Sequence, residues 1–180
     1  MSIGIYFGTD TGRTRRIAKL IAQKLGAIVG DRADAPVNIS RATLDAFLAH
    51  EVLFLGTPTL GDGELPGLSV GLAQESWHEF LPRLLGHDMS GKTVALFGLG
   101  DQVKYGNEFA DALILLYDAV VACGARVIGA WPTDGYSFKA SQALIDGRFV
   151  GLVLDQINQP ALTEARVDAW LQQLAGELRN

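Results

Sequence analysis

The feature that most constrains the fold is a repeated alternation of short apolar runs with longer amphipathic segments. The apolar runs are nearly free of charged residues, as expected for strands buried on both faces of a parallel sheet. The segments between them place apolar residues at helical spacing. The sequence therefore predicts an α/β fold with a doubly wound parallel sheet. The predicted strands are 3–7, 37–39, 52–55, 93–97 and 126–130, and the predicted helices are 13–25, 44–48, 77–85, 109–122 and 164–178.

The length of 180 residues suits one domain, and no linker, repeat or low-complexity tract divides residues 1–180. The first residues lack the pattern of a signal peptide, and no stretch approaches the roughly 18 apolar residues of a membrane span. Cys123 is the single cysteine, so no internal disulfide can form. We expect a single-domain cytoplasmic monomer with no membrane partner.

Charge is distributed unevenly along the chain. The net charge of −5 argues against binding to nucleic acid, whose phosphates select basic surfaces. Residues 62–111 carry eight acidic side chains against three basic ones. Most of these are ordinary solvated residues, but together they would suit a protein partner with a basic docking surface.

The loop after the first predicted strand, residues 8–14, has the sequence GTDTGRT. Backbone amides at a helix N-terminus bind phosphate well, since several donors converge there and the helix dipole favours an anion. The three threonine hydroxyls add donors, and Gly12 permits a tight turn. A single threonine could merely cap the helix, but three around one glycine exceed what a cap requires. This pattern predicts a phosphate site.

Two other glycine motifs do not predict nucleotide binding. Residues 86–93, GHDMSGKT, match the P-loop pattern, but that motif needs a strand before it and a helix after it. Here the predicted helix comes first and the strand follows, so we expect a turn. The Gly98-Leu99-Gly100 segment matches a dinucleotide fingerprint only weakly, because Val103 occupies the place of the third glycine.

Two further loops follow the third and fourth predicted strands. Residues 57–67 are rich in Gly and Pro without a repeat, which is typical of a shaped loop. Residues 98–107 include Tyr105, on which a flat cofactor could stack. In a doubly wound sheet, ligands bind beyond the carboxyl ends of the strands, where these loops would meet.

Together the three loops resemble those of the flavodoxins, in the order Thr-x-Thr-Gly-x-Thr, Thr-Pro-Thr and Gly-x-Gly-Asp-Gln-x-x-Tyr. The resemblance covers essentially the whole chain and implies a five-stranded sheet of order 2-1-3-4-5. Residues 133–152 look like the insertion that interrupts strand five in long-chain flavodoxins. The long stretch between Leu65 and Trp77 is similar to that in flavodoxins of nitrogen-fixing bacteria.

The resemblance implies one non-covalently bound FMN and assigns a set of residues to it. The first loop would hold the phosphate, and the other two would line the faces of the ring, with Tyr105 as the outer stacking aromatic. Leu60 stands where many relatives have Trp, which affects affinity and redox tuning. The predicted cofactor-binding residues are Thr9, Asp10, Thr11, Gly12, Arg13, Thr14, Thr57, Pro58, Thr59, Leu60, Gly61, Asp62, Gly98, Leu99, Gly100, Asp101, Tyr105, Phe109 and Asp155.

The function implied by the resemblance is low-potential electron transport, with the flavin cycling between semiquinone and hydroquinone and without substrate turnover by the protein itself. A ferredoxin–NADP reductase or a pyruvate oxidoreductase would be the electron donor, and the nitrogenase iron protein a candidate acceptor. The Gly61–Asp62 peptide is expected to turn its carbonyl toward the flavin N5 when that atom is protonated.

Two other functional classes fit the sequence less well than the electron carrier. A quinone reductase of the same fold would need room for a second substrate over the flavin, and no second nucleotide loop is present. A signalling receiver domain would need a phosphoacceptor Asp at the end of strand three, where this chain has Gly56-Thr57. The three histidines are scattered, so we expect no metal site.

Overall fold

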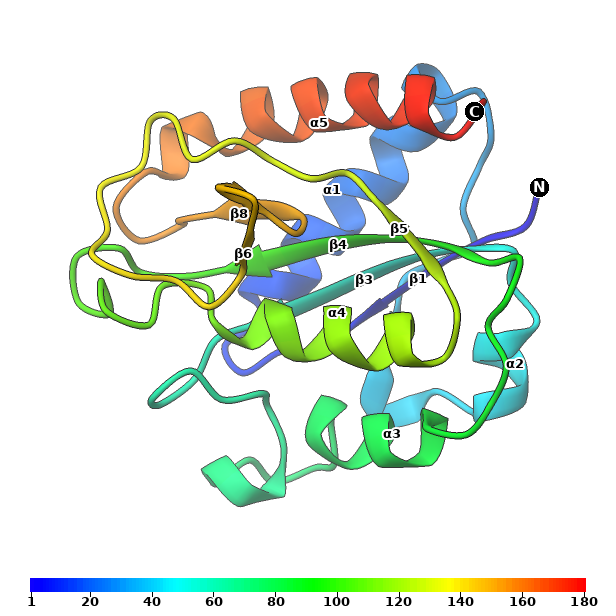
Figure 1. The fold of residues 1–180 in the computed structure, drawn as a ribbon, viewed down its shortest axis with the longest axis horizontal. Coiled ribbons are helices and arrows are strands. Elements are labelled where there is room, and N and C mark those ends of the chain that lie inside the picture. The colour runs from blue at the N-terminus through cyan, green and yellow to red at the C-terminus, as the bar shows by residue number, and fades with distance from the viewer.

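The computed structural model describes all residues from 1 to 180 and contains a central parallel sheet of order β2-β1-β3-β4-β5 (Figure 1). The predicted fold class and strand order are therefore confirmed. The strands of this sheet are β1 (Ile3–Phe7), β2 (Val37–Asn38), β3 (Val52–Pro58), β4 (Thr93–Leu99), β5 (Arg126–Ile128) and β8 (Leu152–Leu154). The helices are α1 (Arg13–Ile28), α2 (Leu44–Leu48), α3 (Trp77–Leu84), α4 (Ala112–Ala122) and α5 (Thr163–Glu177).

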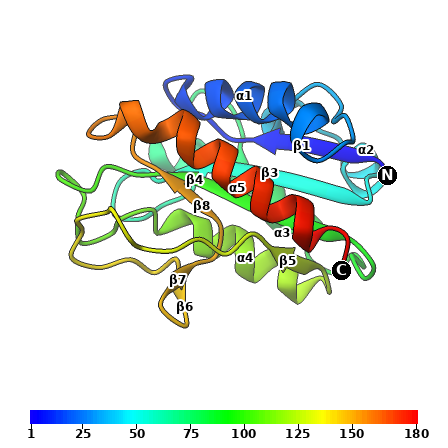
Figure 2. The same cartoon turned by 90° about the horizontal axis from the view of Figure 1, so that it is seen from above.

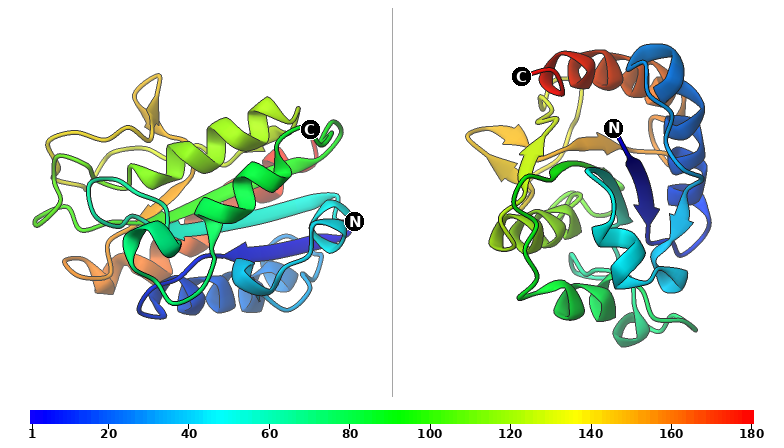
Figure 3. Two further views of the ribbon diagram at one scale, coloured as in Figure 1. Left: turned by 90° about the horizontal axis from the view of Figure 1, so that it is seen from below. Right: turned by 90° about the vertical axis from the view of Figure 1, so that its right-hand side faces the viewer.

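Helices cover both faces of the sheet, and each face has its own apolar core. On one face α1 and α5 lie side by side (Figure 2), joined by Lys24, whose ammonium lies 2.6 Å from Asp168 and 3.0 Å from Glu164. The other face carries α2, α3 and α4 (Figure 3). Burial on both sides explains why β1 and β3 are almost wholly apolar. None of the helices has the length and apolar character needed to cross a membrane.

The fifth strand is split, as the resemblance to long-chain flavodoxins implied. β5 pairs with the first half of β4, where Ala95 lies opposite Ile128, and β8 pairs with the second half, where Phe97 lies opposite Leu152. Residues 129–151 leave the sheet between these two pieces. They include the hairpin of β6 (Leu144–Ile145) and β7 (Arg148–Phe149).

Aromatic side chains hold this insertion against the sheet. The Tyr136 hydroxyl donates a hydrogen bond to the Val153 carbonyl of β8 and accepts one from the Trp131 indole. Burial raises the pKa of Tyr136 to about 12, so the hydroxyl stays a donor at neutral pH. Phe138 and Phe149 pack around Phe109, with ring centroids 5.2 Å and 6.0 Å from it.

Several element boundaries differ from the sequence prediction. β3 and β4 run on to Pro58 and Leu99, because their glycine-containing ends still pair in register, Gly56 with Phe97 and Thr57 with Gly98. The predicted helix 109–122 begins only at Ala112, since Ala110 has a φ of 56°, which is incompatible with an α-helix. The predicted strand 126–130 ends at Ile128, where the insertion begins.

Candidate functional site

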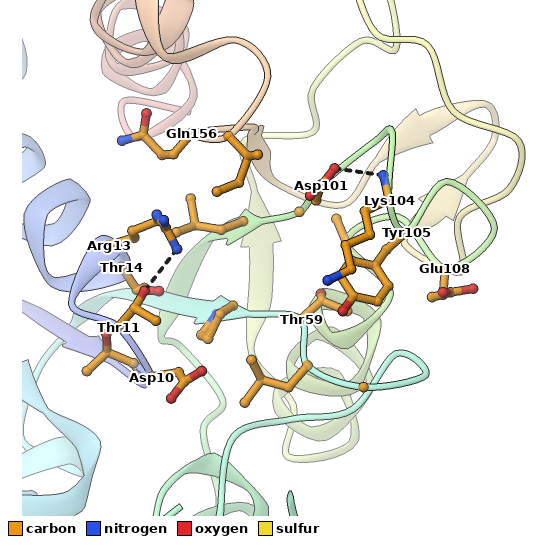
Figure 4. A pocket seen from close by; sticks show the side chains of 18 residues that line it. Asp10, Thr11, Arg13, Thr14, Thr59, Asp101, Lys104, Tyr105, Glu108 and Gln156 are labelled. Atoms are coloured by element: carbon orange, nitrogen blue, oxygen red, sulfur yellow. Dashed lines mark hydrogen bonds between the residues drawn. The ribbon is translucent and has the colours of Figure 1, made fainter.

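A cavity of about 310 Å³ lies at the carboxyl edge of the sheet, where the ends of β1, β3, β4 and β8 meet. Figure 4 shows Asp10, Thr11 and Thr14 on one side and Lys104 and Tyr105 on the other. The lining residues are Thr9, Asp10, Thr11, Arg13, Thr14, Pro58, Thr59, Leu60, Gly61, Leu99, Gly100, Asp101, Lys104, Tyr105, Glu108, Ala110, Gln156 and Ile157.

The first wall is the N-terminus of α1. Gly12 precedes the helix with a φ of 88°, a left-handed conformation that favours glycine, and no side chain caps the helix there. The first-turn amides therefore have no cap within the chain. The Thr9 hydroxyl accepts a hydrogen bond from the Gly12 amide at 3.0 Å, which shapes the loop. Thr14 is only 1% exposed and lines the cavity, so this wall combines helix amides with hydroxyls.

Arg13 belongs to the same wall and gives it a positive charge. Its guanidinium donates a hydrogen bond to the Thr11 hydroxyl at 3.2 Å (Figure 4). No acidic residue lies in the first turn of α1, so the helix dipole is not neutralised there. This end of the cavity is suited to an anion.

The second wall is a tight turn after β3. The Leu60 amide donates to the Glu64 carbonyl at 2.9 Å, and the Glu64 amide donates to the Leu60 carbonyl at 2.7 Å. Between them Gly61 and Gly63 have φ values of 50° and 96°. The Thr59 hydroxyl accepts a hydrogen bond from the Ala112 amide at 3.2 Å, which ties this wall to the start of α4.

The third wall is the loop after β4, and Asp101 organises it. Its carboxylate accepts hydrogen bonds from the amides of Val103 and Lys104 and from the side-chain amide of Asn158. Partial burial acts to raise the pKa of Asp101, but these hydrogen bonds outweigh it and hold the pKa below its ordinary value. Tyr105 follows with 37% of its surface exposed.

Residues after β8 form the fourth wall. Gln156 and Ile157 line the cavity directly, whereas the preceding Asp155 is fully buried. The Asp155 carboxylate accepts hydrogen bonds from the amide and side chain of Gln102 and from the amides of Ile157 and Asn158. Its oxygens therefore connect the third and fourth walls.

The structure brings most of the predicted site residues together and leaves some outside the cavity. The predicted residues that line it are Thr9, Asp10, Thr11, Arg13, Thr14, Pro58, Thr59, Leu60, Gly61, Leu99, Gly100, Asp101 and Tyr105. Those that do not are Gly12, Thr57, Asp62, Gly98, Phe109 and Asp155. Gly12 and Asp62 lie next to lining residues, while Thr57 and Gly98 are buried in the paired ends of β3 and β4.

Two of these positions are buried behind the cavity walls, and their assignment to the cofactor stays a prediction. Phe109 is fully buried, and its ring packs on the insertion aromatics instead of facing the cavity. Asp155 likewise has no exposed surface, and its carboxylate is engaged by protein donors. Each of them supports a wall from behind.

Five lining residues were missed from sequence: Lys104, Glu108, Ala110, Gln156 and Ile157. Lys104 lies within the third loop, residues 98–107, and Glu108 directly follows it, so counting every residue of that loop and the next one would have included both. Gln156 and Ile157 follow the apolar run 152–154, for which no strand is predicted from the sequence. Nothing in the sequence indicates that Ala110 lines the cavity, because its φ of 56° is a conformation that alanine rarely adopts.

Comparison with known proteins agrees with this architecture. The flavodoxin family model matches residues 5–170. The chain is 58% identical over 173 residues to a flavodoxin of Klebsiella pneumoniae, with 96% of each chain covered. It is 56% identical over 174 residues to a flavodoxin of Enterobacter agglomerans, again with 96% of each covered.

A solved structure gives the same result. The crystal structure of Fusobacterium nucleatum flavodoxin bound to flavin mononucleotide is 34% identical to this chain, covers 98% of both chains and superimposes with a TM-score of 0.86. The resemblance seen in the three loops is thus confirmed along nearly the whole length. This chain belongs to the flavodoxin family.

Proposed function

We propose that this protein is a low-potential one-electron carrier that holds one non-covalent FMN in the cavity at the carboxyl edge of the sheet. The observation that carries the proposal is the pairing of two unlike ends within that cavity. One end presents uncapped helix amides and threonine hydroxyls, which suit a phosphate. The other is bounded by Leu60 and Tyr105, which offer apolar surface to a flat ring.

The groups that line the cavity match the two parts of FMN, its phosphate and its ring. A phosphate dianion would be held by the α1 amides, by Thr14 and by the nearby charge of Arg13. The flavin ring would lie against Leu60 and Tyr105. Family membership supports this placement, since the Fusobacterium nucleatum relative is described as bound to flavin mononucleotide.

FMN, when bound, supplies a ring that accepts and releases electrons one at a time. The protein would control the proton at N5 of that ring through the Gly61–Asp62 peptide. Gly61 has a φ of 50°, and glycine permits the peptide to turn with little steric hindrance. The Gly61 carbonyl could then accept a hydrogen bond from a protonated N5.

Acidic side chains around the cavity would make the second electron harder to add. Asp10, Asp101 and Glu108 line it, against Arg13 and Lys104. At ~10 Å and an effective dielectric constant of about 40, one negative charge destabilises another by roughly 0.8 kcal/mol. The excess of acids, together with the phosphate, would keep the second reduction potential low.

We propose that the protein acts as a cytoplasmic single-domain monomer without enzymatic turnover of its own. It would take electrons from a ferredoxin–NADP reductase or a pyruvate oxidoreductase. The nitrogenase iron protein is the acceptor we propose, because the chain resembles flavodoxins of nitrogen-fixing bacteria.

Reconstitution tests the cofactor. Apoprotein titrated with FMN should bind one equivalent, and stepwise reduction with dithionite should proceed in two resolved one-electron steps. Apoprotein that binds no FMN would overturn the proposal.

Turnover assays test the carrier role. NADPH oxidation with cytochrome c as final acceptor should require an added ferredoxin–NADP reductase. Sustained turnover of NADPH and a quinone by this protein alone would identify it as an enzyme. The rate of electron transfer to the nitrogenase iron protein should fall as the salt concentration increases, because the acidic surface would attract the partner electrostatically.

A further inference from the structure

The carbonyl of Gly56 accepts two hydrogen bonds at the edge where the cavity begins. One comes from the Gly8 amide at 2.9 Å, and the other comes from the Trp77 indole at 2.8 Å. A carbonyl oxygen has two lone pairs, so both donors can be accommodated. Gly8 directly precedes the loop 9–14, and Gly56 directly precedes the turn that starts at Thr57.

Trp77 is also in close contact with the backbone of Gly8. A Cβ atom placed on Gly8 would lie 2.6 Å from Cδ1 of Trp77, 2.8 Å from Cγ of Pro66 and 2.9 Å from Oγ of Ser76. These distances are shorter than any van der Waals contact, so only glycine fits. Trp77 is fully buried and is the first residue of α3.

Trp77 therefore connects three parts of the protein, namely Gly8 at the end of β1, the end of β3 and the start of α3. The remaining walls also have hydrogen bonds of their own. The turn at Leu60 is closed by its own pair of hydrogen bonds with Glu64, and the Tyr105 loop is organised by Asp101. Gly8, by contrast, leads directly into residues 9–14 at the phosphate end.

We infer that Trp77 is a positioning residue for the phosphate end of the cavity. Its indole N–H and its packing against Gly8 hold the amides and hydroxyls of residues 9–14 in the convergent arrangement that an anion requires. This inference rests on the proposed FMN function and adds a specificity role to a residue outside the cavity. Its loss should weaken binding of the phosphorylated flavin more than binding of riboflavin, which has the same ring and no phosphate.

A second buried tryptophan provides a matched control. Trp170 is also fully buried, and its indole donates to the Gly129 carbonyl at 2.9 Å. It approaches that glycine as closely, since a Cβ on Gly129 would lie 2.7 Å from its Nε1. However, Trp170 packs on the opposite face of the sheet, and neither it nor Gly129 lines the cavity.

The experiment compares Trp77→Phe and Trp170→Phe with the unmodified protein. Each apoprotein is titrated with FMN and with riboflavin, and its unfolding is followed in urea to verify that it is folded under the binding conditions. Trp77→Phe should raise the Kd for FMN about tenfold, which corresponds to about 1.4 kcal/mol, and the Kd for riboflavin less than about threefold. Trp170→Phe should leave the ratio of the two Kd values unchanged.

Equal effects of Trp77→Phe on both ligands would overturn the inference while leaving the FMN proposal intact. Failure of the unmodified protein to bind FMN would instead defeat the proposed function itself.

A measurement on the unmodified protein covers the case in which Trp77→Phe does not fold. Because coupling between two sites is reciprocal, phosphate binding should stabilise the Trp77 hydrogen bond. Hydrogen exchange of the Trp77 indole N–H should be slowed more by saturating FMN than by saturating riboflavin. The Trp170 indole should respond equally to both ligands. Equal responses at Trp77 would count against the inference.

Discussion

The loops 8–14 and 86–93 contain similar residues at opposite edges of the same sheet. Both combine glycine, threonine and a basic residue, and both contain a glycine in the left-handed region, with φ of 88° at Gly12 and 80° at Gly91. The first opens helix α1 and lines the cavity. The second follows α3, leads into β4 and contributes no residue to the cavity.

The two loops differ in whether their hydrogen-bond donors are already paired within the protein. In the second loop, Lys92 donates hydrogen bonds to the carbonyls of Leu48 and His50, so its ammonium is occupied within the protein. The carboxylate of Asp88 accepts a hydrogen bond from the Ser90 amide. In the first loop the helix amides remain uncapped. Similar residue types thus leave helix amides uncapped where a strand precedes and a helix follows, and are used within the protein where a helix precedes and a strand follows.

The largest effect should come from Thr14→Val, which keeps the size of the side chain and removes its hydroxyl. A hydrogen bond to a phosphate contributes about 2 kcal/mol, so the Kd for FMN should rise roughly 30-fold. The Kd for riboflavin should stay nearly constant. The matched change in the other loop is Thr93→Val, and it should alter neither value. Titration by flavin fluorescence measures all four constants, and a response to Thr93→Val would remove the contrast between the loops.

Next in size is Lys92→Met, which tests whether the second loop is structural. Loss of the charged hydrogen bonds to two carbonyls should lower the free energy of unfolding by about 1.5 kcal/mol. Urea denaturation of the apoprotein measures this change. FMN affinity should be unaffected, and the unmodified protein should not bind ATP. ATP binding that disappears in Lys92→Met would show that the loop is a nucleotide site after all.

A smaller effect is expected from Gly61→Ala. The substitution hinders the peptide turn at a position with positive φ, by about 1 kcal/mol, which corresponds to roughly 40 mV for a one-electron step. The gap between the two midpoint potentials should narrow by about that amount in a redox titration. Gly91→Ala introduces similar backbone strain in the other loop, where a Cβ meets nothing within 4 Å. It should leave both potentials unchanged.

The smallest effect concerns acid stability. Hydrogen bonds lower the pKa of Asp101 in the cavity wall and of Asp88 in the second loop. A lowered folded-state pKa gives stability that is present above the ordinary value near 3.8 and is lost as the pH falls through the folded-state pKa. Asp101→Asn should therefore reduce stability at pH 7, by less than about 1 kcal/mol after solvent screening, and the difference should vanish in strong acid.

The matched variant Asp88→Asn should show the same pH trend in urea unfolding. Only Asp101→Asn should also change FMN affinity, because only Asp101 orders the loop that carries Tyr105. If both variants weakened FMN binding equally, the two loops would not be independent.

Much of the fold could be predicted because its signals are local. The strands β1, β3 and β4 are buried on both faces, so their apolar runs stand out in the sequence. The three loops follow directly from the ends of those strands. The second half of the fifth strand was harder, because the short apolar run 152–154 follows a long excursion and pairs only with β4.

The burial of two predicted site residues was hard to predict for a similar reason. Phe109 and Asp155 were assigned to the cofactor, yet whether a side chain faces a cavity or the interior depends on tertiary packing. Phe109 turns toward Phe138 and Phe149, which lie in the insertion. The role of Trp77 was also invisible in sequence, because its partners Gly8 and Gly56 come from distant parts of the chain.

The split fifth strand makes the insertion separable in principle. Ile128 lies opposite Ala95 and Leu152 lies opposite Phe97, so a single residue is enough to span Leu96. Gly151 already lies against the Leu96 backbone, where a Cβ would come within 2.2 Å of its carbonyl oxygen. Joining Ile128 directly to Gly151 would thus connect β5 and β8 into one continuous strand that keeps its register with β4. The sheet could therefore form without the insertion, but Phe109 would lose its packing against Phe138 and Phe149.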